Sequence, residues 1–326
     1  MRTRRNFLIV SAAGVAFSAA GPVPQIMAQP RVKTAHILTG FTAGLPDAVA
    51  RLLADQMKTY ATSIVVEPRP GASGRVAVEA VKAAPPDGSV VLFAPIGFLT
   101  LFPHTHKTLR YGPQDFVPVS AVGSFAAALT VGPRVPAEAR TVADFVSWCR
   151  ANAKDATYGT PGVGTSMHLI GAALGRAAGF EFLHVPYQGR AAVQDVLKGE
   201  IASAILPIDS SLGLVQSGQL RALATTGSER SRFLPEVPTM MEAGYPLLKD
   251  VTWFGFFVPA KTPSNVIADL NGAIQAALRA SEMESSLAKL SVEIDPISGD
   301  NFAKLLASES ARWKEIVRAT GFSPND

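Results

Sequence analysis

Residues 157–168 read Thr-Tyr-Gly-Thr-Pro-Gly-Val-Gly-Thr-Ser-Met-His, a stretch that passes from a short β-rich run through a glycine-rich loop into a helical pattern. Residues 157–159 predict a strand and residues 166–178 predict a helix. A strand, a loop of small residues and a helix make one βα unit, the building block of α/β proteins.

The same alternation recurs along most of the chain. Further strands are predicted at residues 32–39, 64–67, 90–94, 127–132, 181–185, 202–206, 221–226 and 253–259, and further helices at 46–60, 75–84, 141–151, 191–198, 210–216, 266–280 and 302–319. Repeated βα units predict mainly parallel sheets with both faces covered. A chain of 326 residues without an internal repeat favours two α/β sandwiches, although periodicity alone leaves a (β/α)8 barrel open.

The N-terminus has the pattern of a secretory signal. Arg4 and Arg5 precede an apolar run at residues 7–10, and no charged residue occurs from position 6 to position 30. The adjacent arginines predict twin-arginine export of a signal at residues 1–28 to the periplasm. Cleavage is expected at Ala28, with Ala20 as the second choice. A membrane anchor is disfavoured because Gly and Pro interrupt a run shorter than the roughly 20 residues needed.

The charge of the chain argues against a nucleic-acid partner. The net charge falls from 30 − 26 = +4 to 27 − 26 = +1 when Arg2, Arg4 and Arg5 leave with the signal. Nucleic-acid binding calls for clustered Lys and Arg on one face, and the sequence has no such run.

The residues that ligate metals give no promising pattern, and we expect neither a metal nor a cofactor. Cys149 is the only cysteine and lies in a helical stretch, which is typical of a small buried hydrophobic residue. His104 and His106 form the one close histidine pair, with no carboxylate nearby.

Three glycine-rich loops, at residues 39–44, 71–74 and 159–166, each precede a predicted helix. Backbone amides at a helix N-terminus bind anions without a formal positive charge. A plain helix-capping turn is the alternative for the third loop.

Nucleotide binding and catalysis are both disfavoured. In the third loop Thr165 stands where a phosphate-binding loop has its lysine, and Met167 replaces the last glycine of the dinucleotide pattern. Ser166 and His168 are two residues apart, so they do not face each other on a helix. No Gly-x-Ser-x-Gly elbow occurs in the chain. We therefore predict a protein that is not an enzyme.

Taken together, these motifs resemble the solute receptors of tripartite tricarboxylate transporters, the Bug family. The resemblance covers roughly residues 32–321. It is carried by Gly-Phe-x-x-Gly…Asp-x-x-Ala-Arg-Leu-Leu at 40–53, Val-Glu-Pro-Arg-Pro-Gly-Ala-Ser-Gly at 66–74, Ala-Pro-Pro-Asp-Gly at 84–88, Tyr-Gly-Thr-Pro-Gly-Val-Gly-Thr-Ser-Met-His at 158–168, His-Val-Pro-Tyr-Gln-Gly at 184–189 and Leu-Pro-Glu-Val-Pro-Thr at 234–239. Each motif alone is weak, and their shared order is specific.

The resemblance implies a periplasmic-binding-protein fold of two α/β domains joined by two crossing hinge strands, with a carboxylate ligand in the cleft between them. Domain 1 would comprise residues 30–131 and 255–326, and domain 2 residues 132–254. The protein would be a monomer that captures a small organic acid by domain closure and delivers it to membrane transporter subunits. Two alternatives stay open: a ligand-sensing module that signals to a membrane sensor, and, less favoured, an enzyme acting on a small organic acid.

The resemblance also implies the residues of the cleft. One wall would be formed by Phe41, Thr42, Ala43, Gly44 and Asp47. The other would be formed by Gly162, Gly164, Thr165, Ser166 and His168, with Tyr187, Gln188, Gly189 and Arg190 nearby.

The sequence departs from the family pattern at three places. The first loop lacks the usual double glycine, Leu206 stands near a position that is often acidic, and Arg190 replaces a small residue. The last two changes suggest a more acidic ligand. Arg190 reads equally well as a solvated surface charge.

Overall fold

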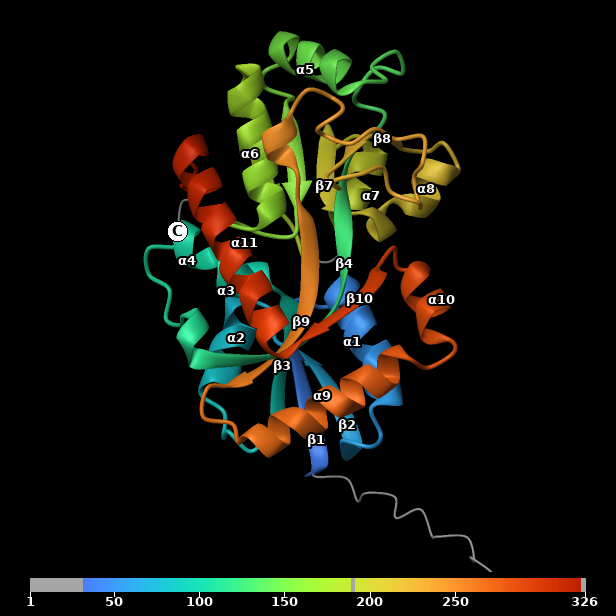
Figure 1. Cartoon of the computed structure of the whole chain (residues 1–326). Helices are drawn as coiled ribbons and strands as arrows, with labels where there is room; N and C mark the ends of the chain where they lie inside the picture. The colour runs from blue at the N-terminus through green and yellow to red at the C-terminus, as the bar shows by residue number, and fades with distance from the viewer. Residues whose placement is uncertain (1–31, 189–190, 324–326) are drawn as a thin grey trace, which may run out of the picture.

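The computed structural model describes residues 32–188 and 191–323. The predicted signal at residues 1–28 and two predicted site residues, Gly189 and Arg190, lie outside the described residues. Figure 1 shows two lobes, with strands β4 (Phe116–Val131) and β9 (Val251–Pro259) running from one lobe into the other.

The first lobe is built on a sheet whose strand order is β2-β1-β3-β9-β4. Strand β1 (Val32–Thr39) pairs in parallel with β2 (Ala61–Pro68) and β3 (Val90–Pro95), and β9 pairs antiparallel with β3 and β4. Strand β10 (Glu293–Ser298) pairs antiparallel with β4. The helices of this part are α1 (Leu45–Gln56), α2 (Arg75–Lys82), α3 (Gly97–Thr100), α4 (Phe102–Thr105), α9 (Ser264–Leu278), α10 (Met283–Ala288) and α11 (Gly299–Thr320).

The second lobe continues the sheet in the order β4-β7-β5-β6, with β8 also paired to β4. Strand β5 (Thr157–Thr160) is parallel to β6 (Leu183–Pro186) and β7 (Ser203–Pro207), whereas β7 and β8 (Arg221–Thr225) run antiparallel to β4. The helices here are α5 (Val142–Ala151), α6 (Ser166–Ala178), α7 (Ala191–Lys198) and α8 (Leu212–Gln216).

Strand β4 changes partners along its length. Residues Phe116 to Ala126 pair with β9, and residues Ala127 to Val131 pair with β7 and β8. Because β4 and β9 are the strands shared between the lobes, the α/β fold with two crossing strands that the resemblance implied is confirmed. The change of partners comes before the predicted domain boundary at residue 131, and the exact division of the chain into domains stays a prediction.

Several elements match their predicted bounds, and others were missed. Strand β1 and helices α6 and α7 begin and end at the predicted residues. Strand β4 begins eleven residues before the predicted start at 127, at Phe116. Pro118 and Gly123 lie inside it, and these residues ordinarily interrupt a strand pattern. Strand β10 and helices α3, α4 and α10 were not predicted, because they are short and depend on partners distant in sequence.

The buried core joins both lobes. One cluster of buried side chains includes Phe93 and Phe254 on the shared sheet, whose rings lie 5.3 Å apart, and Phe145 in the second lobe. Cys149 belongs to the same cluster and is fully buried, which confirms its prediction as a small core residue. Burial raises the pKa of the Cys149 thiol to about 12, so the thiol stays protonated and unreactive at neutral pH.

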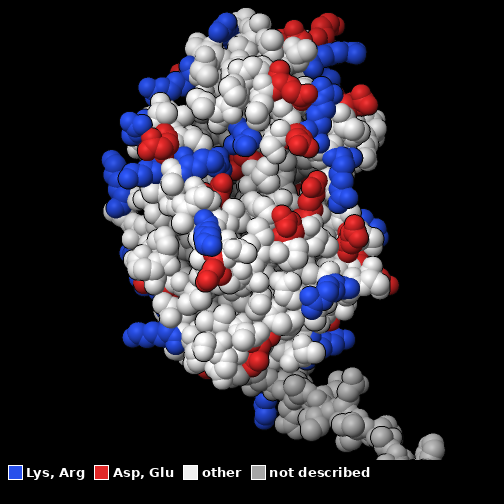
Figure 2. All heavy atoms as spheres, viewed as in Figure 1, with Lys and Arg blue, Asp and Glu red and all other residues white. Residues whose placement is uncertain are grey.

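The outer surface carries charges of both signs. Figure 2 shows Lys and Arg side chains interspersed with Asp and Glu over one face of the molecule.

Within residues 32–188 and 191–323, no helix is both long and apolar enough to cross a membrane.

Candidate functional site

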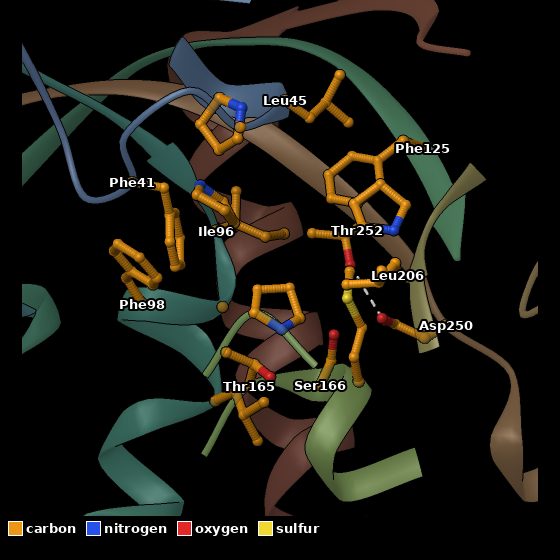
Figure 3. Close-up of a pocket in the computed structure, with 18 of the residues that line it drawn as sticks. Phe41, Leu45, Ile96, Phe98, Phe125, Thr165, Ser166, Leu206, Asp250 and Thr252 are labelled. Atoms are coloured by element: carbon orange, nitrogen blue, oxygen red, sulfur yellow. Dashed lines mark hydrogen bonds between the residues drawn. The ribbon is translucent and has the colours of Figure 1, made fainter. Parts of the chain in front are cut away.

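A chamber lies where the two lobes face each other (Figure 3). Its cavity volume is about 80 Å³. Phe41 and Pro161 line both this chamber and an adjoining recess of about 280 Å³. The recess is bounded by four loop segments, residues 40–42, 70–74, 161–163 and 186–188.

The N-terminus of α6 opens onto the chamber. The hydroxyl of Thr165 caps this helix by accepting a hydrogen bond from the amide of His168 at 3.3 Å. The first bond within the helix runs from the amide of Leu169 to the carbonyl of Thr165. The amides of Ser166 and Met167 precede it and have no acceptor inside the helix, and both residues line the chamber.

The N-terminus of α1 reaches the same chamber from the other lobe. Gly44 is its N-cap, and the first helical bond runs from the amide of Ala48 to the carbonyl of Gly44 at 3.1 Å. The amide of Leu45 therefore has no acceptor inside the helix, and Pro46 has no amide hydrogen to satisfy. All three of Gly44, Leu45 and Pro46 line the chamber.

Two helix N-termini thus converge on one chamber from opposite sides. Figure 3 shows Leu45 across the chamber from Thr165 and Ser166. Each N-terminus carries a partial positive charge and unpaired amides, so the two together favour an anion. Among the described residues that line the chamber there is no Lys, Arg or His. An anion held by these residues would be bound by amides, hydroxyls and helix dipoles.

The two walls touch at the edge of the chamber. A Cβ atom added to Gly162 would lie 2.7 Å from Oγ of Ser73, which belongs to the loop before α2 in the first lobe. A Cβ atom added to Gly164 would lie 2.2 Å from Cε1 of His106, which follows α4. The glycine-rich loop therefore lets the backbone of one lobe approach the other closely.

The structure places the predicted site residues in three groups. Chamber-lining residues are Phe41, Gly44, Thr165 and Ser166; recess-lining residues are Phe41, Thr42, Gly162, Tyr187 and Gln188; Ala43, Asp47, Gly164 and His168 line neither space.

Asp47 is engaged outside the chamber. Its carboxylate accepts two hydrogen bonds of 3.0 Å from the guanidinium of Arg51, one turn further along α1. It therefore contributes to the first turn of α1, where an acidic side chain complements the helix dipole.

His168 packs against a second histidine. Its ring stacks on that of His184, with centroids 3.7 Å apart and planes 13° from parallel. Nδ1 of His168 accepts a hydrogen bond from the amide of Gly164 at 3.1 Å. Burial, with a smaller effect of His184, lowers the pKa of His168 to about 3, and burial lowers the pKa of His184 to about 4. Both rings are therefore neutral at pH 7. His168 stabilises the glycine-rich loop at 159–166 through its hydrogen bond with the amide of Gly164.

Several lining residues were not predicted as site residues. They include Ile96, Phe98, Phe125, Asp250, Thr252, Glu309 and Trp313. Most are apolar residues on strands or amphipathic helices, where the sequence pattern is that of an ordinary core. Ser73 lines the recess, and the glycine-rich pattern at 71–74 is the sequence feature that could have indicated this. Among the described residues, no group of three or more His, Cys, Asp or Glu is arranged to hold a metal ion.

A chamber between two α/β lobes that share two strands defines a solute-binding receptor of the periplasmic-binding-protein type. The chain belongs to the tripartite tricarboxylate transporter family of receptors, whose family model matches residues 49–322.

Individual relatives agree with this assignment. The protein BugT of Bordetella pertussis is 31% identical over 286 residues, which is 85% of this chain and 86% of BugT. The structure of Rpa4515 from R. palustris with adipate has a TM-score of 0.83 at 28% identity, covering 91% of this chain and 99% of Rpa4515. MatC from Rhodopseudomonas palustris with bound malate has a TM-score of 0.81 at 26% identity, covering 87% of this chain and 99% of MatC.

Proposed function

We propose that this protein is an extracytoplasmic receptor that captures a small carboxylate between its two lobes and delivers it to a tripartite tricarboxylate-type transporter. The observation that carries the proposal is the convergence of the N-termini of α1 and α6 on one chamber. A carboxylate oxygen accepts hydrogen bonds from amides on both walls only when the walls are close together. Ligand affinity therefore favours the closed arrangement over an open one.

The relatives support a carboxylate as the ligand. Rpa4515 was solved with adipate and MatC with malate, and both share the fold of this chain over most of its length. The chemical groups in the chamber favour capture of the ligand over its turnover. The chamber offers amides, hydroxyls and apolar groups, its two carboxylates, Asp250 and Glu309, are bonded to Arg312, and neither histidine of the stacked pair lines it.

The test is a thermal-shift screen of the protein without residues 1–28 against mono-, di- and tricarboxylates. A ligand at a hundred times its Kd stabilises the folded state by about 2.7 kcal/mol. Matched carboxamides serve as controls, because they keep the shape of the ligand and lack the negative charge. We expect acids to raise Tm and their amides to leave it unchanged. If no acid in the panel raised Tm, the proposal would be contradicted.

Delivery to a transporter requires a separate experiment. We expect the ligand-loaded receptor to drive uptake of labelled ligand in membrane vesicles that contain the large and small transporter subunits. Uptake without the receptor, or no uptake with it, would contradict delivery. Binding without uptake, together with ligand-dependent activation of a membrane sensor, would favour the sensing alternative.

The proposed location is the periplasm, reached by the twin-arginine route. Replacement of both Arg4 and Arg5 by Lys is expected to leave the protein in the cytoplasm, because that route reads the arginine pair. Fractionation of cells that produce the two forms gives the result. Equal export of both forms would assign the protein to another route.

A further inference from the structure

We propose that the ligand of this receptor is a compact monocarboxylate with an uncharged apolar body, and that the chamber selects against a second carboxylate. The inference rests on the proposed function, because it assumes that the amides at the two helix N-termini hold one carboxylate. The residues that line the same chamber then indicate which class of acid fits there.

The walls beyond the two helix N-termini are mostly apolar. Phe98, Phe125, Leu206 and Trp313 line the chamber and are between 2% and 5% exposed. Figure 3 shows Phe41 beside Phe98 on one side of the chamber and Phe125 on the other, and the rings of Phe41 and Phe98 lie 5.9 Å apart. A charged group pushed against these surfaces would lose its hydration without gaining a partner, whereas an apolar group would be stabilised by the same burial.

The charged side chains that line the chamber are acidic. Among the described lining residues they are Asp250, which is 3% exposed, and Glu309. The carboxylate of Asp250 accepts a hydrogen bond of 2.9 Å from the hydroxyl of Thr252. A second ligand carboxylate would meet like charges here, which is unfavourable.

Arg312 offsets only part of this negative charge. Its guanidinium donates to Glu309 at 2.7 Å and to Asp250 at 3.3 Å. It also lies over the ring of Trp313, 4.1 Å from the ring centroid. Two carboxylates and one guanidinium leave this corner with a net charge of −1, and the arginine already has two anionic partners.

The sequence alone suggested the opposite. Leu206 in place of an acidic residue and Arg190 in place of a small one together suggest a more acidic ligand, and Arg190 lies outside the described residues. In the structure Leu206 adds to the apolar wall. Asp250, just before β9, and Glu309 on α11 bring acids to the chamber instead. The described part of the chamber therefore favours a less acidic ligand than the sequence suggested.

Calorimetric titration with matched acids tests the inference. The probes are benzoate against benzene-1,4-dicarboxylate, hexanoate against adipate, and acetate as a carboxylate without an apolar body. We expect each monocarboxylate with an apolar body to bind at least about tenfold more tightly than its dicarboxylate partner and than acetate. Dicarboxylates that bind equally well or better would overturn the inference and leave the proposed function intact. Failure of every acid to bind would overturn both.

A variant isolates the acidic corner. Glu309→Gln removes one negative charge and keeps a hydrogen-bond acceptor for Arg312. We expect it to raise the affinity for a dicarboxylate relative to that for its matched monocarboxylate by about three- to tenfold. Glu315→Gln is the control, since Glu315 lies on the same helix, pairs with Arg318 in the same way and is exposed. Equal behaviour of the two variants would overturn the role of Glu309 in selection.

Discussion

Gly162 lies directly against Ser73 across the cleft, so close that a Cβ atom on the glycine would lie 3.0 Å from Cβ of the serine. One residue belongs to the loop between β5 and α6 and the other to the loop before α2. The contact therefore joins the two lobes through small residues, and it shows how near the walls come to each other.

This contact predicts that bulk at position 162 opposes closure. Gly162→Ala is expected to weaken carboxylate binding about tenfold, because the added methyl group holds the two loops apart. Ser73→Gly in the same protein should restore most of the affinity, and glycine also suits the positive φ of 56° at position 73. Titration calorimetry on the single and double variants provides the measurement. Wild-type affinity in Gly162→Ala would show that the contact does not govern closure.

Removal of the side-chain cap of α6 is expected to lower the stability of the protein. Thr165→Val removes the hydroxyl that accepts from the amide of His168 and donates to the carbonyl of Gly162 at 2.9 Å. We expect the free energy of unfolding in urea to fall by about 1 kcal/mol. Thr165→Ser keeps the hydroxyl and should stay close to the wild type. A fall of the same size in Thr165→Ser, which keeps the hydroxyl, would contradict the role of the hydroxyl as the cap.

Two arginines on α11 form a matched pair. Arg312 bonds to the buried Asp250, whereas the partner of Arg318 among the described residues is the exposed Glu315. Arg312→Ala leaves a buried carboxylate without its counter-charge and is expected to lower the free energy of unfolding by about 3 kcal/mol or more. Arg318→Ala should change it by less than about 0.5 kcal/mol, because exposed ion pairs contribute little. Denaturant titrations that gave equal losses would contradict this account of Asp250.

The stacked histidines predict a dependence of stability on pH. The pKa of His168 is lowered to about 3 and that of His184 to about 4, mainly by burial. In the unfolded chain both titrate near about 6.5, so the unfolded state binds more protons below that pH. Their contribution is complete above about pH 6.5 and is lost progressively as the pH falls toward 4.

The measurement is the free energy of unfolding between pH 7 and pH 4 for the wild type and for His168→Asn. The asparagine keeps an acceptor for the amide of Gly164 and does not titrate. Carboxylates elsewhere contribute equally to both proteins, so the difference between the two curves isolates the imidazole. The wild type should lose more stability on acidification, and parallel curves would contradict the lowered pKa.

Much of the fold was accessible from local sequence. The stretch at 157–168, with its strand, glycine loop and capped helix, is encoded within a dozen residues, because capping and periodicity act between near neighbours. The same holds for β1, α6 and α7, whose bounds were predicted correctly. Strand β4 was largely missed because its stability comes from pairing with β7, β8, β9 and β10, all distant in sequence.

In the site, too, the features that depend on local sequence were predictable and those that depend on tertiary packing were not. The sequence by itself determined the glycine-rich loops and the helix N-termini that can hold an anion, since these depend on local backbone conformation. Only the tertiary structure decided what surrounds that anion. Phe125, Leu206, Asp250 and Glu309 come from four separate segments of the chain and meet because β4 and β9 bring the two lobes face to face. Long-range packing therefore sets the apolar and acidic character of the chamber, which no local pattern records.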